Sequence, residues 1–219
     1  MAKVVITGAN RGIGLALTKK YLLEGHDVVA LCRRTSTELS ETSAQIIENV
    51  DVTNLSVLEK VATEVGEMDI LINNAGVLYN ESLDSLDFDH IQQQVEVNTY
   101  APLKVAMTLG KGLKKGSVFG ILTSRMGSIA DNDSGSYYGY RLSKAAANAL
   151  GKSLAMDLKE QGITVLLLHP GFVKTEMTGN QGLIDTVESA SGLYDVVQEH
   201  GKISNTGTFW HSNGESLPW

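Results

Sequence analysis

The feature that most constrains the fold is a regular alternation of short β-branched runs with longer segments of helical periodicity. Alternating strands and helices imply a parallel sheet. Nearly apolar runs such as VLLL at Val165–Leu168 fit strands that are covered on both faces. Right-handed crossovers then give a doubly wound sheet, in which ligands bind beyond the carboxyl ends of the strands. We therefore predict an α/β fold, a single Rossmann-type domain over residues 1–219 with about seven strands and helices on both faces.

The expected elements follow from the periodicity and the turn residues. Strands are expected at residues 3–8, 27–32, 44–52, 68–76, 117–124, 163–171 and 206–212. Helices are expected at residues 11–26, 54–67, 88–113, 138–160 and about 183–200, with Asn54 as an N-cap. Every motif discussed below falls at the carboxyl end of an expected strand, and this shared position carries more weight than any one motif.

Composition excludes several other classes of protein. The formal net charge is −7 and no basic stripe is present, so a nucleic-acid partner is not expected; the short KGLKK cluster is interpreted as a solvated helix end. Cys32 is the one cysteine, which rules out an intrachain disulfide and a Cys-rich zinc site. No apolar run approaches the ~20 residues that span a bilayer, and the start resembles no signal peptide. We expect no membrane partner and a cytoplasmic location.

A glycine-rich turn, TGANRGIG at Thr7–Gly14, joins the first expected strand to the first helix. Glycines there permit positive φ and close approach of the backbone to a phosphate, and the helix N-terminus adds free N–H groups. The gap between Gly8 and Gly12 differs from the usual G-x-G-x-x-G spacing, so the turn alone is a weak signal. Its position after the first strand favours a dinucleotide site over a purely structural turn.

The end of the second expected strand, ALCRRT, indicates which dinucleotide would bind. NAD-binding folds place an acidic residue there to bond the ribose 2′-hydroxyl. Arg33 and Arg34 stand there instead, and Arg11 lies within the glycine turn. Guanidinium groups suit a 2′-phosphate. We therefore favour NADP(H) over NAD(H), although arginines of this kind are also common at surfaces.

Tyr140 and Lys144 are spaced i and i+4 on an expected helix, which places them on one face. A nearby ammonium group favours the phenolate and so lowers a tyrosine pKa from its usual value of about 10. Such a phenol can give a proton to a carbonyl oxygen during hydride transfer. Tyr137 and Arg141 share the spacing, but SGSYY is expected to be loop. We interpret Tyr137 and Tyr138 as pocket or surface residues.

In combination these motifs resemble the short-chain dehydrogenase/reductase family, over about Val4 to Met177. The resemblance rests on TGANRGIG, DV, NNAG, the asparagine of VEVNTY, the serine of ILTSRMG, YRLSK and HPGFVKTEM, in that order. The C-terminal part is similar to the carbonyl-reductase-like branch that includes the C-factor proteins. The resemblance implies a catalytic tetrad of Asn98, Ser124, Tyr140 and Lys144. The loop before Tyr140 is about three residues longer than is common in the family, which leaves Ser128 as an alternative to Ser124.

The resemblance also implies a set of cofactor-binding residues, and the histidine spacings give no reason to expect a catalytic metal. Asp51 and Val52 would flank the adenine, NNAG would let the backbone pass close to the cofactor, and Thr175 would bind the carboxamide or the diphosphate. The full set is Gly8, Asn10, Arg11, Gly12, Ile13, Gly14, Arg33, Asp51, Val52, Asn74, Ala75, Gly76, Tyr140, Lys144, Pro170, Gly171, Val173 and Thr175. His169 is interpreted as a packing residue rather than a base, and no histidine has a metal-ligand spacing.

The predicted function is an NADPH-dependent oxidoreductase that reduces an aldehyde or ketone, or catalyses the reverse reaction. The alternative is a dinucleotide-binding signalling module of the C-factor type with little or no turnover. The predicted partners are a small carbonyl or alcohol substrate and further copies of the chain, in a homodimer or homotetramer formed through the two long helices. The short segment after Thr175 suggests an open substrate pocket.

Overall fold

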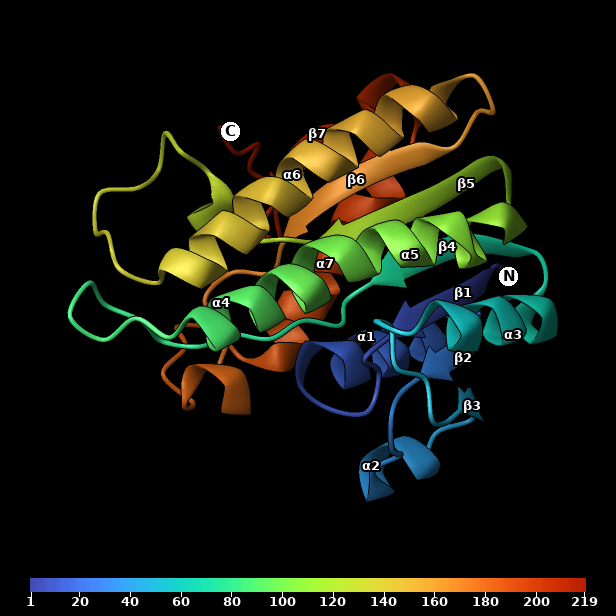
Figure 1. The fold of residues 1–219 in the computed structure, drawn as a ribbon. Helices are drawn as coiled ribbons and strands as arrows, with labels where there is room; N and C mark the ends of the chain where they lie inside the picture. The colour runs from blue at the N-terminus through green and yellow to red at the C-terminus, as the bar shows by residue number, and fades with distance from the viewer.

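The computed structural model describes residues 1–219 and contains one seven-stranded sheet (Figure 1). Every neighbouring pair of strands is parallel, and the order across the sheet is β3-β2-β1-β4-β5-β6-β7. The strands are β1 (Lys3–Thr7), β2 (Asp27–Leu31), β3 (Gln45–Ile47), β4 (Met68–Asn73), β5 (Leu113–Leu122), β6 (Thr164–His169) and β7 (Thr208–His211). The predicted doubly wound α/β fold is therefore confirmed.

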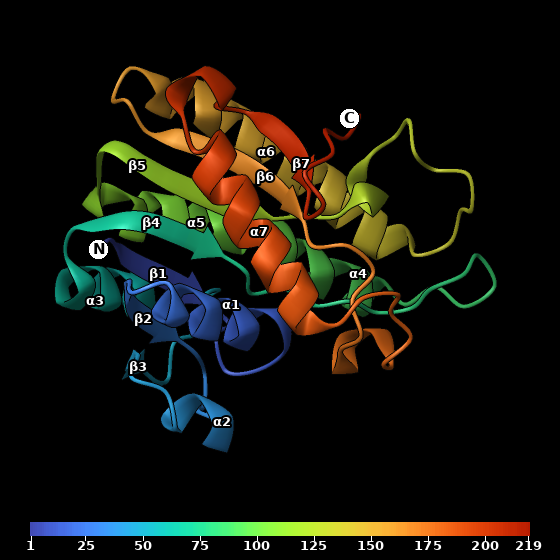
Figure 2. The same ribbon diagram turned by 180° about the vertical axis from the view of Figure 1, so that it is seen from behind.

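Helices cover both faces of the sheet. One face carries α3 (Leu55–Val65), α4 (Phe88–Val95), α5 (Ala101–Met107) and α6 (Tyr138–Lys159), as Figure 1 shows. The other face carries α1 (Gly12–Leu23) and α7 (Thr186–His200), which lie in front in Figure 2. A short helix, α2 (Thr37–Ser40), lies beside β3 at the edge. None of these helices is both long and apolar enough to cross a membrane.

Two apolar cores, one on each face, explain the nearly continuous apolar strands. Successive residues of β1 point to opposite faces, so Val5 belongs to the core under α3 and α5, whereas Val4 and Ile6 belong to the core under α1 and α7. Burying one such aliphatic side chain contributes about 1.5–3 kcal/mol. Packing of helices on both faces therefore holds the sheet rigid, including the carboxyl ends of its strands.

The predicted helix over residues 88–113 is interrupted, which corrects the expectation of one long helix. α4 passes into a π-helical turn at Glu96–Tyr100, α5 follows, and a 3₁₀ turn at Leu109–Gly112 ends the segment. Pro102 lies in the first turn of α5, where its missing N–H costs little. The apolar periodicity continues through this region and so did not reveal the interruption, but the proline could have indicated it.

The bounds of two strands also differ from prediction, and one further helix is present. β5 begins at Leu113 instead of residue 117, so Lys114 and Lys115 of the KGLKK cluster lie on a strand and not at a helix end. β3 has only the three residues Gln45–Ile47, within the range 44–52 that was predicted. The helix α2 was not expected; Ser36 caps it by accepting a hydrogen bond from Leu39 N–H.

Candidate active site

A cleft of about 310 Å³ opens at the carboxyl edge of the sheet. It lies where β1 adjoins both β2 and β4, the point at which the direction of winding reverses. Its lining includes every residue predicted to bind a cofactor except Gly171 and Val173. Segments far apart in the sequence thus meet at one site.

The glycine turn forms the floor at the β1 end of the cleft. Gly8 and Gly12 have φ of +66° and +53°, a region that favours glycine. A Cβ on Gly14 would lie 2.2 Å from the Gly8 carbonyl oxygen, so a side chain there would displace the backbone. The N-terminus of α1 has no side-chain cap and no acidic residue in its first turn. Its free N–H groups can therefore serve an anion.

The NNAG segment at the end of β4 (Asn73–Gly76) is hydrogen-bonded to this turn. Asn74 donates from Nδ2 to the carbonyl oxygens of Thr7 (2.9 Å) and Gly8 (3.0 Å). The Thr7 hydroxyl in return accepts hydrogen bonds from the N–H groups of Asn74 and Ala75, each 3.1 Å long. Asn74 therefore fixes the shape of the glycine turn, a role that the sequence did not indicate.

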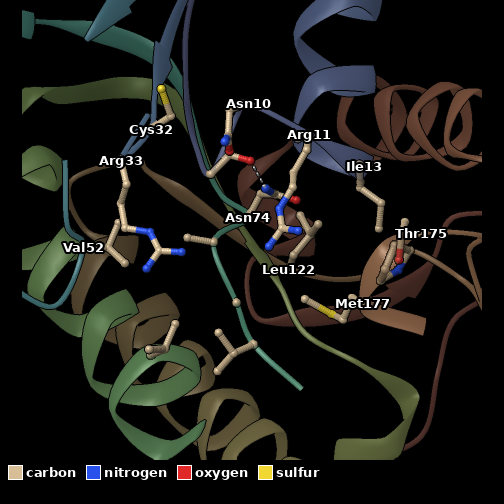
Figure 3. A pocket seen from close by; sticks show the side chains of 18 of the residues that line it. Asn10, Arg11, Ile13, Cys32, Arg33, Val52, Asn74, Leu122, Thr175 and Met177 are labelled. Carbon is tan, nitrogen blue, oxygen red and sulfur yellow. Dashed lines mark hydrogen bonds between the residues drawn. The ribbon is translucent and has the colours of Figure 1, made fainter. Parts of the chain in front are cut away.

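Arginines gather at the outer end of the cleft. Asn10, Arg11, Arg33 and Arg34 line a second hollow beside it, which has no hydrophobic residue in its wall. Figure 3 shows the Arg11 and Arg33 side chains extending into the same open region, with Thr175 and Met177 across the opening. Arg11 also forms an ion pair with Glu176 across the mouth. This end of the cleft is suited to a multiply charged anion.

Asp51 and Val52 follow the β3 edge and form the wall beside this basic end. The Asp51 carboxylate accepts hydrogen bonds from the Thr53 N–H (2.9 Å) and hydroxyl (2.7 Å). These bonds lower the pKa of Asp51, and the charge of Arg33 adds to the effect. The carboxylate is therefore held ionised, and its orientation is fixed by the loop.

Tyr140 and Lys144 lie one turn apart near the start of α6 and are both buried. The lysine Nζ lies 5.7 Å from the centre of the tyrosine ring and donates a 2.9 Å hydrogen bond to the Leu122 carbonyl at the end of β5. Both side chains line the cleft opposite the glycine turn. The predicted shared face is thus present, and it points into the cleft.

Burial sets the ionisation of this pair. Desolvation raises the pKa of Tyr140 to about 12, and hydrogen bonding to Ser124 acts weakly in the opposite direction. Desolvation also lowers the pKa of Lys144 to about 8. The expected lowering of the tyrosine pKa by the lysine charge is therefore not found, because burial shifts the pKa of Tyr140 in the opposite direction.

The two candidate serines are placed differently. Ser124 follows β5 and lies near enough to Tyr140 to act on the pKa of its phenol. It also accepts a 3.1 Å hydrogen bond from the Met126 N–H, which fixes the side chain at the start of a 3₁₀ turn. Neither serine lines the cleft, and the Ser128 hydroxyl is buried without a hydrogen-bond partner. The proximity of Ser124 to Tyr140 favours Ser124 over Ser128.

Asn98 occupies the π-helical turn and does not line the cleft. Its amide accepts a 2.9 Å hydrogen bond from Val77 N–H and donates a 2.8 Å bond to Val77 C=O. It also donates to the Ser143 hydroxyl at 3.0 Å. Asn98 therefore ties the loop after β4 to the helix that bears Tyr140.

The segment after β6 brings only two of its four predicted cofactor-binding residues to the cleft wall. Pro170 and Thr175 line the cleft, but Gly171 and Val173 do not. Val173 is buried and bridges to Ile184, and a Cβ on Gly171 would meet Ile184 Cδ1 at 2.8 Å. Both residues therefore shape this segment from behind the cleft.

His169, at the end of β6, packs edge-on against His211 with ring centres 4.8 Å apart. Burial lowers its pKa to about 3, helped by the charges of His211, Arg125 and Lys144. It does not line the cleft, in keeping with a packing role.

The sequence did not single out several other residues of the cleft wall. They lie directly at strand ends or beside predicted motifs, which is the signal that could have identified them. They are Cys32, Val50, Thr53, Val77, Val97, Leu122, Thr123, Glu176 and Met177. No group of three or more His, Cys, Asp or Glu side chains lies close enough together to hold a metal ion.

The residues present fit an extended dinucleotide. The absence of side chains at Gly8 and Gly14, the uncapped α1 terminus and the basic hollow suit phosphate groups, and the cleft continues from there to Tyr140 and Lys144. A redox cofactor bound along this path would end beside the buried phenol.

Comparison with known proteins gives a consistent result. The protein-family model for short chain dehydrogenase matches residues 2–183. The chain is 36% identical, over the full length of both proteins, to 1-hydroxy-2-glutathionyl-2-methyl-3-butene dehydrogenase of Rhodococcus sp. (strain AD45). It is also 36% identical to the C-signal protein of Myxococcus xanthus, over 70% of this chain and 94% of that one. The crystal structure of NADPH-bound carbonyl reductase from chicken fatty liver superposes with a TM-score of 0.89 at 28% identity, covering 99% and 98% of the two chains.

Proposed function

The chain belongs to the short chain dehydrogenase family of oxidoreductases, and on that premise we propose that it is an NADPH-dependent carbonyl reductase, or the reverse alcohol dehydrogenase. One observation carries the proposal. Tyr140 and Lys144, side by side on α6, line the same cleft as the glycine turn between β1 and α1. A proton donor and a dinucleotide cradle thus face one space.

NADPH, when bound, supplies the hydride. The N–H groups at the start of α1 would hold its diphosphate, and Asp51 and Val52 would lie beside the adenosine. Pro170 and Thr175 would contact the nicotinamide end. At the glycine turn, the closely packed backbone would bring the phosphates near N–H donors rather than near side chains.

Residues of α6 and of the loop after β5 would carry out the proton transfer. Tyr140 holds its proton at the phenolic oxygen, since burial keeps its pKa high. The Ser124 hydroxyl, beside that phenol, would donate a hydrogen bond to the substrate oxygen and hold it at Tyr140. Lys144, with a pKa of about 8, is largely cationic at neutral pH and would favour loss of the phenolic proton as the substrate oxygen gains negative charge. Asn98 would maintain the spacing by fixing the π-helical turn and the loop after β4 against α6.

Preference for NADPH over NADH is part of the proposal. It is supported by Arg33, Arg34 and Arg11 around the outer hollow, where an NAD-binding fold carries an acid. The chicken carbonyl reductase structure contains bound NADPH, and this chain shares its fold at 28% identity.

The test is a turnover assay together with cofactor titration. Aldehydes, ketones and quinones would be offered with NADPH, and alcohols with NADP⁺. The alcohols should include a thioether adduct of glutathione, because the Rhodococcus relative is named for such an alcohol. We expect oxidation of NADPH with at least one carbonyl, and tighter binding of NADPH than of NADH. Tight binding with no turnover over the whole panel would contradict the proposal.

A second candidate function is a dinucleotide-binding signalling module, favoured by the C-signal relative. The same panel separates the two, since a module of this kind would bind NADPH without consuming it. The paired Tyr140 and Lys144 in the cleft favour the reductase.

A further inference from the structure

The N-terminus of α6 is built in an unusual way. Its N-cap residue is Tyr137, which makes no side-chain capping bond. Ser136 and Tyr137 are both left-handed, with φ of 54° each, although neither is glycine. The helix that bears Tyr140 and Lys144 therefore begins in a strained segment with no cap of its own. Such a conformation persists only where surrounding structure enforces it.

Glu81, from the loop after β4, supplies the missing cap. One carboxylate oxygen accepts a 2.6 Å hydrogen bond from the Gly139 N–H in the first turn of α6. The backbone carbonyl of Glu81 accepts a 2.8 Å bond from the Tyr137 N–H. The residue is only 1% exposed. A negative group at a helix N-terminus is electrostatically favourable, and here a residue distant in sequence provides it.

The neighbours of Glu81 require a carboxylate at this position. Its second oxygen accepts a 2.5 Å bond from Gln94 Nε2, a buried side chain of α4. The Gln94 amide cannot turn round, because its oxygen accepts a 3.0 Å bond from the Tyr79 N–H. Both oxygens of Glu81 thus face N–H donors. An amide at position 81 would set one donor against another.

Gly139 packs so closely against Glu81 and Gln94 that there is no room for a side chain on it. A Cβ on Gly139 would lie 2.4 Å from Gln94 Nε2 and 2.8 Å from the Glu81 carboxylate. Gly139 directly precedes Tyr140, so the position of the phenol follows from the position of this backbone. Ser124 and Lys144, which lie near the phenol, are anchored separately at the end of β5.

We propose that Glu81 is a positioning residue for the reaction: its buried carboxylate, held by Gln94, fixes the first turn of α6 and so sets the Tyr140 hydroxyl against Ser124 and the substrate oxygen. This inference rests on the proposed function for its catalytic part. The cap itself does not depend on that function.

The first test is Glu81→Gln in the full chain, assayed well below its melting temperature. We expect kcat to fall on the order of 10- to 100-fold, since misplacement of a catalytic group by about 1 Å has effects of this size. The Kd for NADPH should stay within about twofold, because none of the residues in this cap contacts the dinucleotide end of the cleft. Glu64→Gln, an exposed glutamate on α3, is the matched control and should leave both quantities unchanged.

The second test exchanges the two side chains. In Glu81→Gln/Gln94→Glu, the new amide at 81 can accept from Gly139 and donate to the new carboxylate at 94, which can also accept from Tyr79. Every donor is then satisfied again. We expect this double variant to recover most of the lost kcat, whereas Gln94→Glu alone, which sets two carboxylates together, should be as impaired as Glu81→Gln.

Hydrogen exchange of the unmodified protein supplies a readout that is independent of catalysis. The Gly139 amide should exchange at least tenfold more slowly than the amides of the preceding loop, and Glu81→Gln should abolish this protection. A variant with a lower melting temperature but unchanged kcat would overturn the proposal, as would an unprotected Gly139 amide in the wild-type protein. If the wild type reduces no carbonyl, the proposed function fails, while the exchange data still decide whether Glu81 caps α6.

Discussion

The two ends of the cleft are built by different means. The dinucleotide end, formed by the glycine turn, Arg33 and Asp51, consists mainly of backbone and of short stretches that directly follow β1, β2 and β3. The reaction end, formed by Tyr140 and Lys144 with Ser124 close to them, consists of side chains from α6 and from the loop after β5 that are buried together. The first end depends on local conformation and the second on packing between distant segments.

This difference has a consequence for ionisation. At the reaction end, burial shifts the pKa of Tyr140 upward and that of Lys144 downward, and His169 behind them is shifted further still. At the dinucleotide end, hydrogen bonds from the Thr53 backbone and side chain keep Asp51 ionised. Changes at the reaction end should therefore act on chemistry and on pH dependence, whereas changes at the dinucleotide end should act on affinity.

The largest expected effect is that of Tyr140→Phe. Removal of the phenolic hydroxyl takes away the proton donor and should lower kcat by about 10³-fold, within the usual range for general acid catalysis. The Kd for NADPH should change less than about threefold, since the ring remains in place. Steady-state turnover and fluorescence titration of NADPH measure the two quantities.

Tyr138→Phe is the matched control for that experiment, because Tyr138 lies two residues earlier on α6 and is 43% exposed. Its turnover should equal that of the wild type. Equal activity of Tyr140→Phe and the wild type would remove the distinction between the two ends of the cleft, because the buried phenol would then have no role in chemistry.

The same difference explains how much the sequence revealed. The alternation of strands and helices, the glycine turn and the cleft-lining motifs were predictable because each depends on residues that are close in sequence, with regular periodicity. The interruption of the helix at the π-helical turn around Asn98 and at Pro102 was not predicted, because the apolar periodicity of residues 88–113 continues through both. The Asn98 side chain bonds to Val77 and Ser143, and no local pattern announces such partners.

Other features depend on contacts that only the folded chain creates. The hydrogen bond from Asn74 to Gly8 and the Glu81 cap on α6 join residues more than fifty positions apart. The pKa of Tyr140 is raised, whereas the sequence predicted that it would be lowered. The i+4 spacing indicates a neighbouring charge but not the depth of burial, and burial has the larger effect.

Acid should destabilise the protein through His169. Its pKa is lowered from 6.5 to about 3, so below pH 6.5 the unfolded chain takes up a proton that the folded chain does not bind. Stability from this group is therefore complete above pH 6.5 and declines as the pH falls. Between pH 6.5 and 4.5 the loss should be about 2–3 kcal/mol. Urea unfolding at several pH values measures it.

His169→Leu sharpens that measurement. The variant should show a smaller decline in the free energy of unfolding over the same interval, with His211 still present in both proteins. The pKa of His211 is also lowered by burial, so part of the acid sensitivity should remain. An identical pH dependence in the two proteins would show that His169 is not the source of the acid sensitivity.

Arg33→Ser tests the dinucleotide end in isolation. A hydrogen bond to a charged group contributes about 1.5–3 kcal/mol, so the Kd for NADPH should rise about 10- to 100-fold. The Kd for NADH, which has no 2′-phosphate, should stay within about twofold and serves as the control ligand. Titrations at fixed ionic strength are required because exposed charges are screened by salt. Equal weakening of both cofactors would show that Arg33 does not read the 2′-phosphate.

The smallest expected effect concerns the ion pair between Arg11 and Glu176, the salt bridge that joins the glycine turn to the segment after β6 across the cleft mouth. The two side chains are 63% and 79% exposed, so the pair should contribute at most about 1 kcal/mol to folding. Glu176→Gln should therefore leave the urea midpoint almost unchanged. The substitution also frees Arg11 and removes a negative charge from the mouth.

NADPH should consequently bind Glu176→Gln two- to fivefold more tightly than the wild type, in line with about 1 kcal/mol or less for an exposed charge, and the gain should shrink as salt is added. Glu64→Gln makes the same change in net charge on α3, remote from the cleft, and should leave the Kd unaltered. If Glu176 instead held the mouth closed over a bound cofactor, its loss would weaken NADPH binding and speed its release. The sign of the change in Kd thus decides whether Glu176 competes with the cofactor for Arg11 or helps Arg11 to retain the cofactor.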